Sequence, residues 1–189
     1  MKNYYENSQA VMEELEHLLE KISNEEIDQY VKALLEAREV FFIGVGRVRL
    51  SLEAAVKRLT HLEISCHMVG DLNEPPITDK DLLVVGSGSG ESVIPLEIAK
   101  KAKSYGATVI HLTSNPDSSI AKLADHIVKF DSPSKSNQTF TSIQPMTTVF
   151  EQGLLIFHDV LALRLMNEKQ MTMDCLLYTS PSPRDSTSS

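Results

Sequence analysis

Short apolar runs recur along the chain and predict the strands of a buried sheet. The clearest are 40–43 and 82–85, which consist almost entirely of branched and aromatic residues. Three further runs, at 65–69, 108–112 and 126–130, have similar lengths, and the last is more polar, as an edge strand often is. Continuous apolar runs are typical of parallel strands that are covered on both faces. The pattern therefore predicts a mostly parallel five-stranded sheet.

Helical periodicity fills the segments around these runs. Helices are expected over 8–21, 24–37, 50–62, 92–105, 119–124 and 147–168. Ser23 or Asn24, followed by Glu26, predicts a capping box at the start of the second helix. Strands that alternate with helices indicate βαβ units, so the fold class is α/β, a single doubly wound domain with its sheet flanked by helices.

The last predicted helix, 147–168, is apolar on several faces. A surface helix carries one apolar stripe, so part of this helix is expected to pack against another subunit. The chain is therefore predicted to form a homo-oligomer, a dimer or a tetramer.

Composition sets the domain boundaries. The chain has 189 residues and is 42% hydrophobic, which suits one sizeable core. We expect the domain to span 1–174. Residues 175–189 are rich in Ser, Thr and Pro, are expected to be disordered, and resemble translated cloning sequence more than a native terminus. In that case the native C-terminus is missing.

Charge and hydropathy exclude several classes of partner. A formal net charge of −8 opposes binding to nucleic acid or to an anionic membrane, so an anionic ligand must be held by a local site. The apolar runs are too short to span a bilayer, and no signal-peptide stretch opens the chain, which predicts a cytoplasmic protein. The two cysteines, Cys66 and Cys175, lie outside any metal-ligand spacing, and Cys66 is expected to be a buried strand thiol. No metal site is expected.

The strongest chemical signal is the loop after the run 82–85, because ligands of parallel sheets bind beyond the carboxyl ends of the strands. It contains Ser87, Gly88, Ser89 and Ser92. Its small residues let backbone N–H groups converge, its hydroxyls add donors, and a helix begins beside it. The loop lacks the Gly-Lys-Ser/Thr of a nucleoside triphosphate site, so we interpret it as a phosphate-binding loop of another kind.

Two other loops follow apolar runs. The loop 44–49 starts like a dinucleotide fingerprint but has Arg49 where the third glycine belongs, which disfavours NAD. Gly46 still allows close approach to a ligand and Arg47 can reach an anion, and the alternative is a tight strand-to-helix turn with solvated arginines.

The loop 113–118 has the turn and N-cap chemistry of Asn-Pro-Asp-Ser. That structural role accounts for Asp117 and Ser118. Thr113 and Ser114 are expected to line the crevice.

These loops together resemble the sugar isomerase (SIS) family. The resemblance rests on Ser-Gly-Ser-Gly-Glu-Ser at 87–92, Gly-Val-Gly-Arg at 44–47, Arg-Leu-Thr-His-Leu at 58–62 and Thr-Ser-Asn-Pro-Asp-Ser at 113–118. It covers about residues 5–170. The segment 144–152 is similar to the 6-phospho-3-hexuloisomerase subfamily. The resemblance implies a sugar phosphate ligand and a homo-oligomer, commonly a tetramer, that converts 3-hexulose 6-phosphate to fructose 6-phosphate through an enediol without metal or cofactor.

Isomerisation needs a base, and a carboxylate with a raised pKa suits that task. Glu151 begins an apolar helix and matches the glutamate that the family uses, although an acidic residue there also complements the helix dipole. His61 is a second candidate, for ring opening or proton shuttling, although a lone histidine on an apolar helix is often structural.

Two positions depart from the family pattern. Val48 stands where the family has a phosphate-binding serine, and no histidine follows His158 although the subfamily places one near its C-terminus. Two alternative functions therefore stay open. One is a phosphosugar-sensing module without catalysis, and the other is an isomerase of another phosphosugar such as arabinose 5-phosphate.

Overall fold

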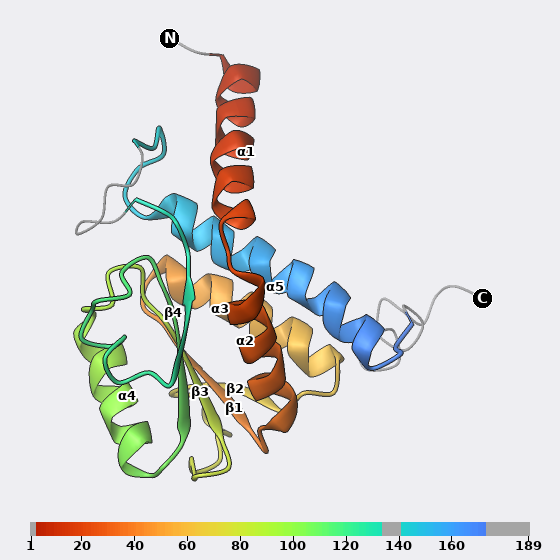
Figure 1. Cartoon of the computed structure of the whole chain (residues 1–189), viewed down its shortest axis with the longest axis vertical. Helices are drawn as coiled ribbons and strands as arrows, with labels where there is room; N and C mark the ends of the chain where they lie inside the picture. The colour runs from red at the N-terminus through yellow and green to blue at the C-terminus, as the bar shows by residue number, and fades with distance from the viewer. Residues whose placement is uncertain (1–2, 134–140, 173–189) are drawn as a thin grey trace.

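The computed structural model describes residues 3–133 and 141–172 and contains the predicted parallel sheet (Figure 1). Its strands are β1 (Val40–Ile43), β2 (Cys66–Met68), β3 (Leu82–Gly86), β4 (Thr108–Thr113) and β5 (His126–Lys129). Their order is β2-β1-β3-β4-β5 and every pair is parallel. The α/β doubly wound fold is confirmed, and β5 lies at an edge as its polarity predicted.

Five helices surround the sheet in the described part of the chain. They are α1 (Tyr4–Glu20), α2 (Asn24–Glu36), α3 (Arg47–His61), α4 (Val93–Ser104) and α5 (Thr148–Glu168). Helix α1 begins four residues earlier than predicted, because Asn3 and Glu6 form a capping box. The predicted tail, 175–189, lies outside the described residues.

Two local predictions are wrong. Segment 119–124 forms consecutive turns instead of a helix. Its hydrogen bonds do not form a regular helical series, since Ala124 N–H donates to the carbonyls of both Ile120 and Ala121. The expected capping box of α2 is absent because Ser23 makes no side-chain cap and Glu26 instead accepts a hydrogen bond from Lys129 N–H at 2.9 Å. Glu26 thereby joins α2 to β5.

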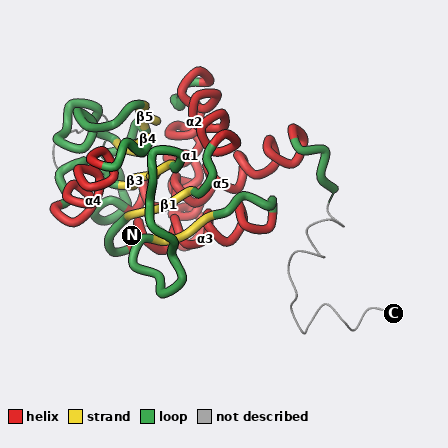
Figure 2. Tube along the Cα trace, turned by 90° about the horizontal axis from the view of Figure 1, so that it is seen from below, coloured by secondary structure: helices red, strands yellow, loops and turns green. Residues whose placement is uncertain are grey.

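Alternate residues of the central strands feed two separate cores. Phe42 and Val84 face a core shared with α1, α2, α3 and α5, whereas Phe41 and Leu83 face a smaller core under α4. Figure 2 shows α4 on one side of the sheet and the other helices opposite. Because helices cover both faces of the sheet, its backbone is accessible to a ligand at the ends of the strands.

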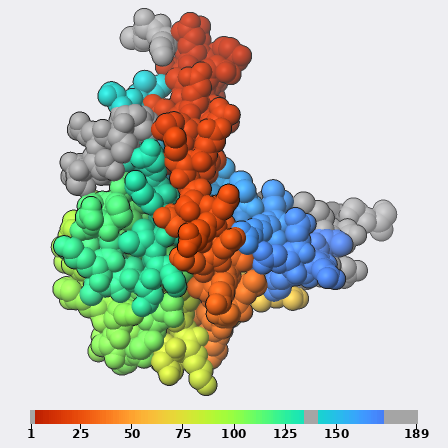
Figure 3. Space-filling model, in the orientation of Figure 1, coloured from red at the N-terminus to blue at the C-terminus, as the bar shows by residue number. Residues whose placement is uncertain are grey.

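Helices α1 and α5 pack together on the larger core. Leu18 of α1 is fully buried, and a Cβ on Gly153 of α5 would lie 2.8 Å from its side chain, so the two helices cross closely there. The amino-terminal half of α1 projects beyond the rest of the domain (Figures 1 and 3). The start of α5 is thus held between α1 and the carboxyl end of the sheet.

Candidate active site

The strand order reverses between β1 and β3. From β1 the chain crosses through α3 to β2 on one side, and then returns to form β3 on the other side of β1. Loops diverge at such a switch point and leave a crevice. A cleft of about 670 Å³ opens there, which we call the switch-point cleft. Its lining consists of Val45, Gly46, Arg47, Val48, Gly86, Ser87, Gly88, Ser89, Ser92, Pro145, Met146, Thr147, Thr148 and Glu151.

The loop that follows β3 is held from behind by the loop that follows β4. Thr113 Oγ1 and Ser114 N–H both donate to the carbonyl of Gly88, at 3.2 and 3.1 Å. Ile120 N–H donates to the carbonyl of Gly90 at 3.2 Å. The acceptors of the phosphate-type loop are therefore occupied on the side away from the cleft.

The donors of the same loop remain available. Gly88, Ser89 and Ser92 line the cleft, and nothing within 3–133 and 141–172 accepts a hydrogen bond from their backbone N–H groups. Helix α4 starts directly after Ser92, so its positive dipole end adds to the same region. An anion that enters the cleft meets N–H groups rather than carbonyls, which is the arrangement that binds phosphate without a lysine.

The shape of this loop is fixed by its own serines and by one glycine. Ser87 Oγ accepts from Gly90 N–H and lies 3.1 Å from Ser92 Oγ. Gly90 has a φ of +67°, and a Cβ on it would lie 1.9 Å from Ser118 Oγ. Only glycine fits there, so the loop is shaped before any ligand arrives.

A carboxylate and a guanidinium meet on the opposite wall. Arg47 Nε donates to Glu151 Oε2 at 2.6 Å, and Thr147 Oγ1 donates to Glu151 Oε1 at 2.9 Å. The Glu151 side chain is 10% exposed and that of Arg47 is 65% exposed. Glu151 is therefore a nearly buried carboxylate whose two oxygens are both oriented, while Arg47 can still reach a ligand.

Val48 fills the floor of the cleft. It is 8% exposed, and a Cβ placed on Gly44 or Gly86 would lie 2.9 or 3.0 Å from its Cγ1. The two glycines thus make room for this side chain and for Leu52 beside it. The position at which the family resemblance implies a serine makes an apolar contact here and offers no hydroxyl donor to the cleft.

The structure brings most of the predicted site residues together, but not all of them. Thr113 and Ser114 are fully buried behind the loop rather than in the lining of the cleft. His61 ends α3, a helix of 15 residues that starts at the cleft with Arg47, so the two ends lie about 20 Å apart. Burial, then the nearby Lys57 and Arg58, lower the pKa of His61.

Sequence reasoning missed the segment that closes the cleft from above. Pro145, Met146 and Thr147 line it, and Thr147 orients Glu151 directly. The only signal was the resemblance of 144–152 to the isomerase subfamily, since nothing in the polarity of this segment points to a site.

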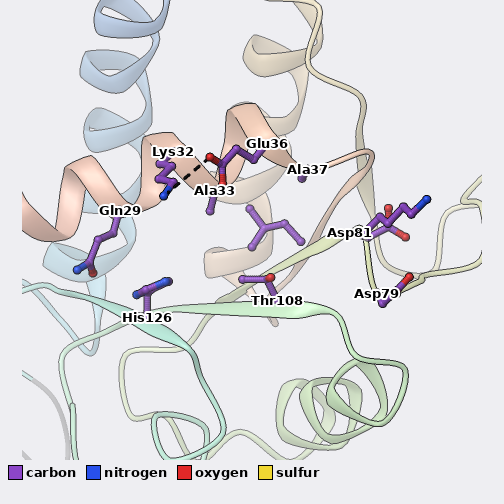
Figure 4. Close-up of a pocket in the computed structure, with 11 residues that line it drawn as sticks. Gln29, Lys32, Ala33, Glu36, Ala37, Asp79, Asp81, Thr108 and His126 are labelled. Carbon is purple, nitrogen blue, oxygen red and sulfur yellow. Dashed lines mark ion pairs between the residues drawn. The ribbon is translucent and has the colours of Figure 1, made fainter.

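A second pocket, of about 530 Å³, lies at the amino ends of β3, β4 and β5 (Figure 4). We call it the amino-end pocket. Lys32 and Glu36 pair along its α2 wall, with Thr108 and His126 opposite. Beside them Asp81 accepts hydrogen bonds from the Arg38 side chain, from Thr78 and from the backbone N–H of Glu39.

Other kinds of site receive no support from the described residues. Within 3–133 and 141–172 no three His, Cys, Asp or Glu side chains are grouped so that they could hold a metal ion. Burial raises the pKa of the Cys66 thiol to about 12, which keeps it protonated and unreactive. None of the helices in this part of the chain is long and apolar enough to cross a membrane.

Comparisons with known proteins agree with the geometry. The family model of the SIS domain matches residues 33–158. A Bacillus subtilis protein named 3-hexulose-6-phosphate isomerase is 39% identical over 168 residues, which cover 88% of this chain and 91% of that protein. A Mycobacterium gastri protein of the same name is 34% identical over 151 residues, 79% of this chain and 76% of that one.

A solved structure, described as that of a hypothetical protein, superposes with a TM-score of 0.85 at 34% identity. The superposition covers 93% of this chain and 95% of that one. The matched family span is well over half of the chain, and it contains the loops after β1, β3 and β4 together with Glu151. The chain therefore belongs to the SIS domain family.

Proposed function

We propose that this protein is a phosphosugar isomerase that interconverts 3-hexulose 6-phosphate and fructose 6-phosphate. The observation that carries the proposal is the presence, in one cleft, of an anion-binding loop and an oriented carboxylate. The names of relatives that are 34–39% identical to this chain support the same reaction. We expect the reaction to take place in the cytoplasm.

The phosphate would be held by the loop after β3. The N–H groups of Gly88, Ser89 and Ser92 and the hydroxyls of Ser87 and Ser89 are the donors nearest to a bound dianion. Each hydrogen bond to a charged group contributes about 1.5–3 kcal/mol. Binding the phosphate at this end leaves the sugar carbons to extend toward the α5 wall, where Glu151 lies.

Glu151 would act as the base. In 3-hexulose 6-phosphate the carbonyl is at C3, and a carboxylate can remove the proton from C2 while the C3 carbonyl becomes an enediol oxygen. The carboxylic acid then gives C3 either that proton or one exchanged with solvent, while the C2 hydroxyl proton passes to the C3 oxygen and the carbonyl re-forms at C2, which gives fructose 6-phosphate. The reaction consists of proton transfers alone, so as proposed it needs no cofactor.

Arg47 would serve both ends of the substrate. Its hydrogen bond to Glu151 Oε2 orients the carboxylate toward the cleft. Its exposed guanidinium can also contact the phosphate or an enediolate oxygen. Because the guanidinium is shared, ligand binding is expected to loosen its contact with Glu151.

We also propose that the protein works as a homo-oligomer, a dimer or a tetramer. Leu155, Val160 and Leu163 of α5 are exposed apolar residues, which supports burial of this helix against a second copy. Since His61 lies far from the cleft of its own chain, any catalytic part for it would be in the cleft of a neighbouring subunit.

A substrate panel tests the proposal. Fructose 6-phosphate, arabinose 5-phosphate and ribulose 5-phosphate are each incubated with the full chain, and new sugar signals are followed by NMR. We expect fructose 6-phosphate alone to yield a 3-hexulose phosphate. Turnover of arabinose 5-phosphate instead would reassign the substrate, and tight binding without any turnover would favour a phosphosugar sensor.

A further inference from the structure

A carboxylate on α1 holds the segment that closes the switch-point cleft. Glu14, half-buried on α1, accepts hydrogen bonds from Ser142 Oγ at 2.8 Å, from Ile143 N–H at 2.8 Å and from Gln144 Nε2 at 2.9 Å. All three donors belong to one short segment, residues 142–147, which we call the strap. The contact joins parts of the chain about 130 residues apart.

The strap leads directly into the cleft. Its last three residues, Pro145, Met146 and Thr147, line the cleft, and Thr147 Oγ1 donates to Glu151. Met146 has a φ of +57°, a conformation that a side-chain-bearing residue keeps only where the surrounding structure enforces it. α5 fixes one end of this turn, and Glu14 fixes the other.

No other element shares this task within the described residues. The hydrogen bonds to Glu14 are the only ones that tie 142–144 to another helix or strand in 3–133 and 141–172. A single ionised carboxylate with two oxygens can serve three donors, which a neutral side chain of the same size cannot do as well.

Attachment of α1 to the domain does not depend on Glu14. Leu15 and Leu18 of α1 are 5% and 0% exposed, Leu18 belongs to the larger core, and Leu19 packs against it. Loss of the carboxylate would therefore release the strap while leaving the helix in place. We therefore expect loss of the Glu14 carboxylate to change the cleft and not the stability of the whole fold.

We propose that Glu14 is a positioning residue that sets the upper wall of the cleft and, through Thr147, the orientation of the Glu151 carboxylate. This inference rests on the proposed isomerase function. Glu14 is not among the residues that line the cleft. It acts by holding the strap at the distance from the anion-binding loop at which a phosphosugar is clamped between them.

The test compares Glu14→Gln with a matched control, Glu16→Gln, an exposed position on the same helix. Glu14→Gln is expected to lower kcat/KM by about tenfold or more, since displacement of a cleft wall by 1 Å can cost up to about 10²-fold. Both KM and kcat should change, because the wall and the base are both affected. The unfolding temperatures of the two variants should agree within about 2 °C.

A charge swap gives the decisive second variant. In Glu14→Gln with Gln144→Glu, the amide on α1 donates to the carboxylate on the strap and still accepts from Ile143 N–H, so kcat/KM should recover by at least about half of the lost factor. Equal kinetics of Glu14→Gln and Glu16→Gln would overturn the inference. So would a fall in unfolding temperature that tracks the loss of activity and is not relieved by the swap.

The two proposals fail in distinguishable ways. If the unaltered chain turns over no sugar phosphate, the proposed function fails, and the affinity for fructose 6-phosphate, measured by calorimetry, replaces the rate as readout. The strap is then supported by about tenfold weaker binding in Glu14→Gln than in Glu16→Gln, and is overturned by equal binding.

Discussion

The two ends of this sheet are both polar and both hollowed, yet they are built differently. At the amino end the carboxylate of Asp81 is fully buried and accepts from Arg38, Thr78 and Glu39, so its hydrogen-bonding capacity is filled. At the carboxyl end the loop carbonyls are occupied, while no residue in the described part of the chain accepts from the N–H groups of Gly88 and Ser89.

This difference is more informative than size or polarity. The pockets have similar volumes, about 530 and 670 Å³, and both carry charged side chains. The two pockets differ in their hydrogen bonding. Within 3–133 and 141–172, only the switch-point cleft is lined by a shaped, nearly buried loop whose N–H donors lack acceptors. A filled polar cluster stabilises the fold, whereas unfilled donors that converge on one point bind an anion.

Acid should lower the free energy of unfolding through the two ends of the sheet at different pH values, and this is the largest effect that we expect. Burial lowers the pKa of His111, which lies against the loop residue Gly90, to about 4. Burial likewise lowers the pKa of His158 to about 4. The unfolded chain binds these protons near pH 6.5, so the free energy of unfolding falls between pH 6.5 and 4, by about 3 kcal/mol per histidine.

Asp81 behaves in the opposite sense. Burial alone would raise its pKa, but the hydrogen bonds from Arg38 and Thr78 lower it overall. Its contribution to stability is present above the ordinary pKa of 3.8 and is lost only as the pH falls through the lower folded pKa.

Denaturant titrations from pH 7 to 3 test the role of His111. His111→Asn, which keeps a donor for the Val85 carbonyl, should show a smaller loss of unfolding free energy above pH 4 than the unaltered chain. An unchanged pH slope would contradict this assignment.

Removal of the amino-end carboxylate should destabilise the fold without affecting the ligand. Asp81→Asn places an amide N–H₂ among the buried Thr78 donors and removes the carboxylate that pairs with the partly exposed Arg38, so we expect a loss of up to about 3 kcal/mol in unfolding free energy. Phosphosugar affinity at a temperature where the variant is folded should be unchanged. Weakened binding would mean that the two ends are coupled and that the comparison fails.

Sequence patterns predicted the strands and the phosphate-type loop because burial and small residues leave local signatures. They did not distinguish a loop that lines a cleft from one that supports it. Thr113 and Ser114 are small hydroxyl residues after a strand, as Ser87 and Ser89 are, and only the registration of β4 beside β3 puts them behind. The strap escaped prediction because its position depends on Glu14, which is far away in sequence.

Substitution of the loop serines tests the carboxyl end of the sheet, as Asp81→Asn tests the amino end. Ser87→Ala with Ser89→Ala should weaken phosphosugar binding by about tenfold or more per lost donor, or about 2–3 kcal/mol in total. Free sugars should not stabilise either protein. Ser104→Ala, on the exposed end of α4, serves as the control in calorimetric titrations. Equal affinity of the double variant and the control would show that this loop does not bind the phosphate.

The role of Glu151 as a base is tested most directly by isotope exchange in D₂O. Glu151→Gln keeps the shape of the side chain and removes the base. The account predicts that deuterium entry at the reacting carbons of fructose 6-phosphate and kcat both fall at least about 10²-fold, with ligand affinity nearly kept. A residue that only complements the helix dipole would instead cost about 0.3–1 kcal/mol of stability and leave the rate alone. Deuterium entry at the unaltered rate in Glu151→Gln would contradict the central claim.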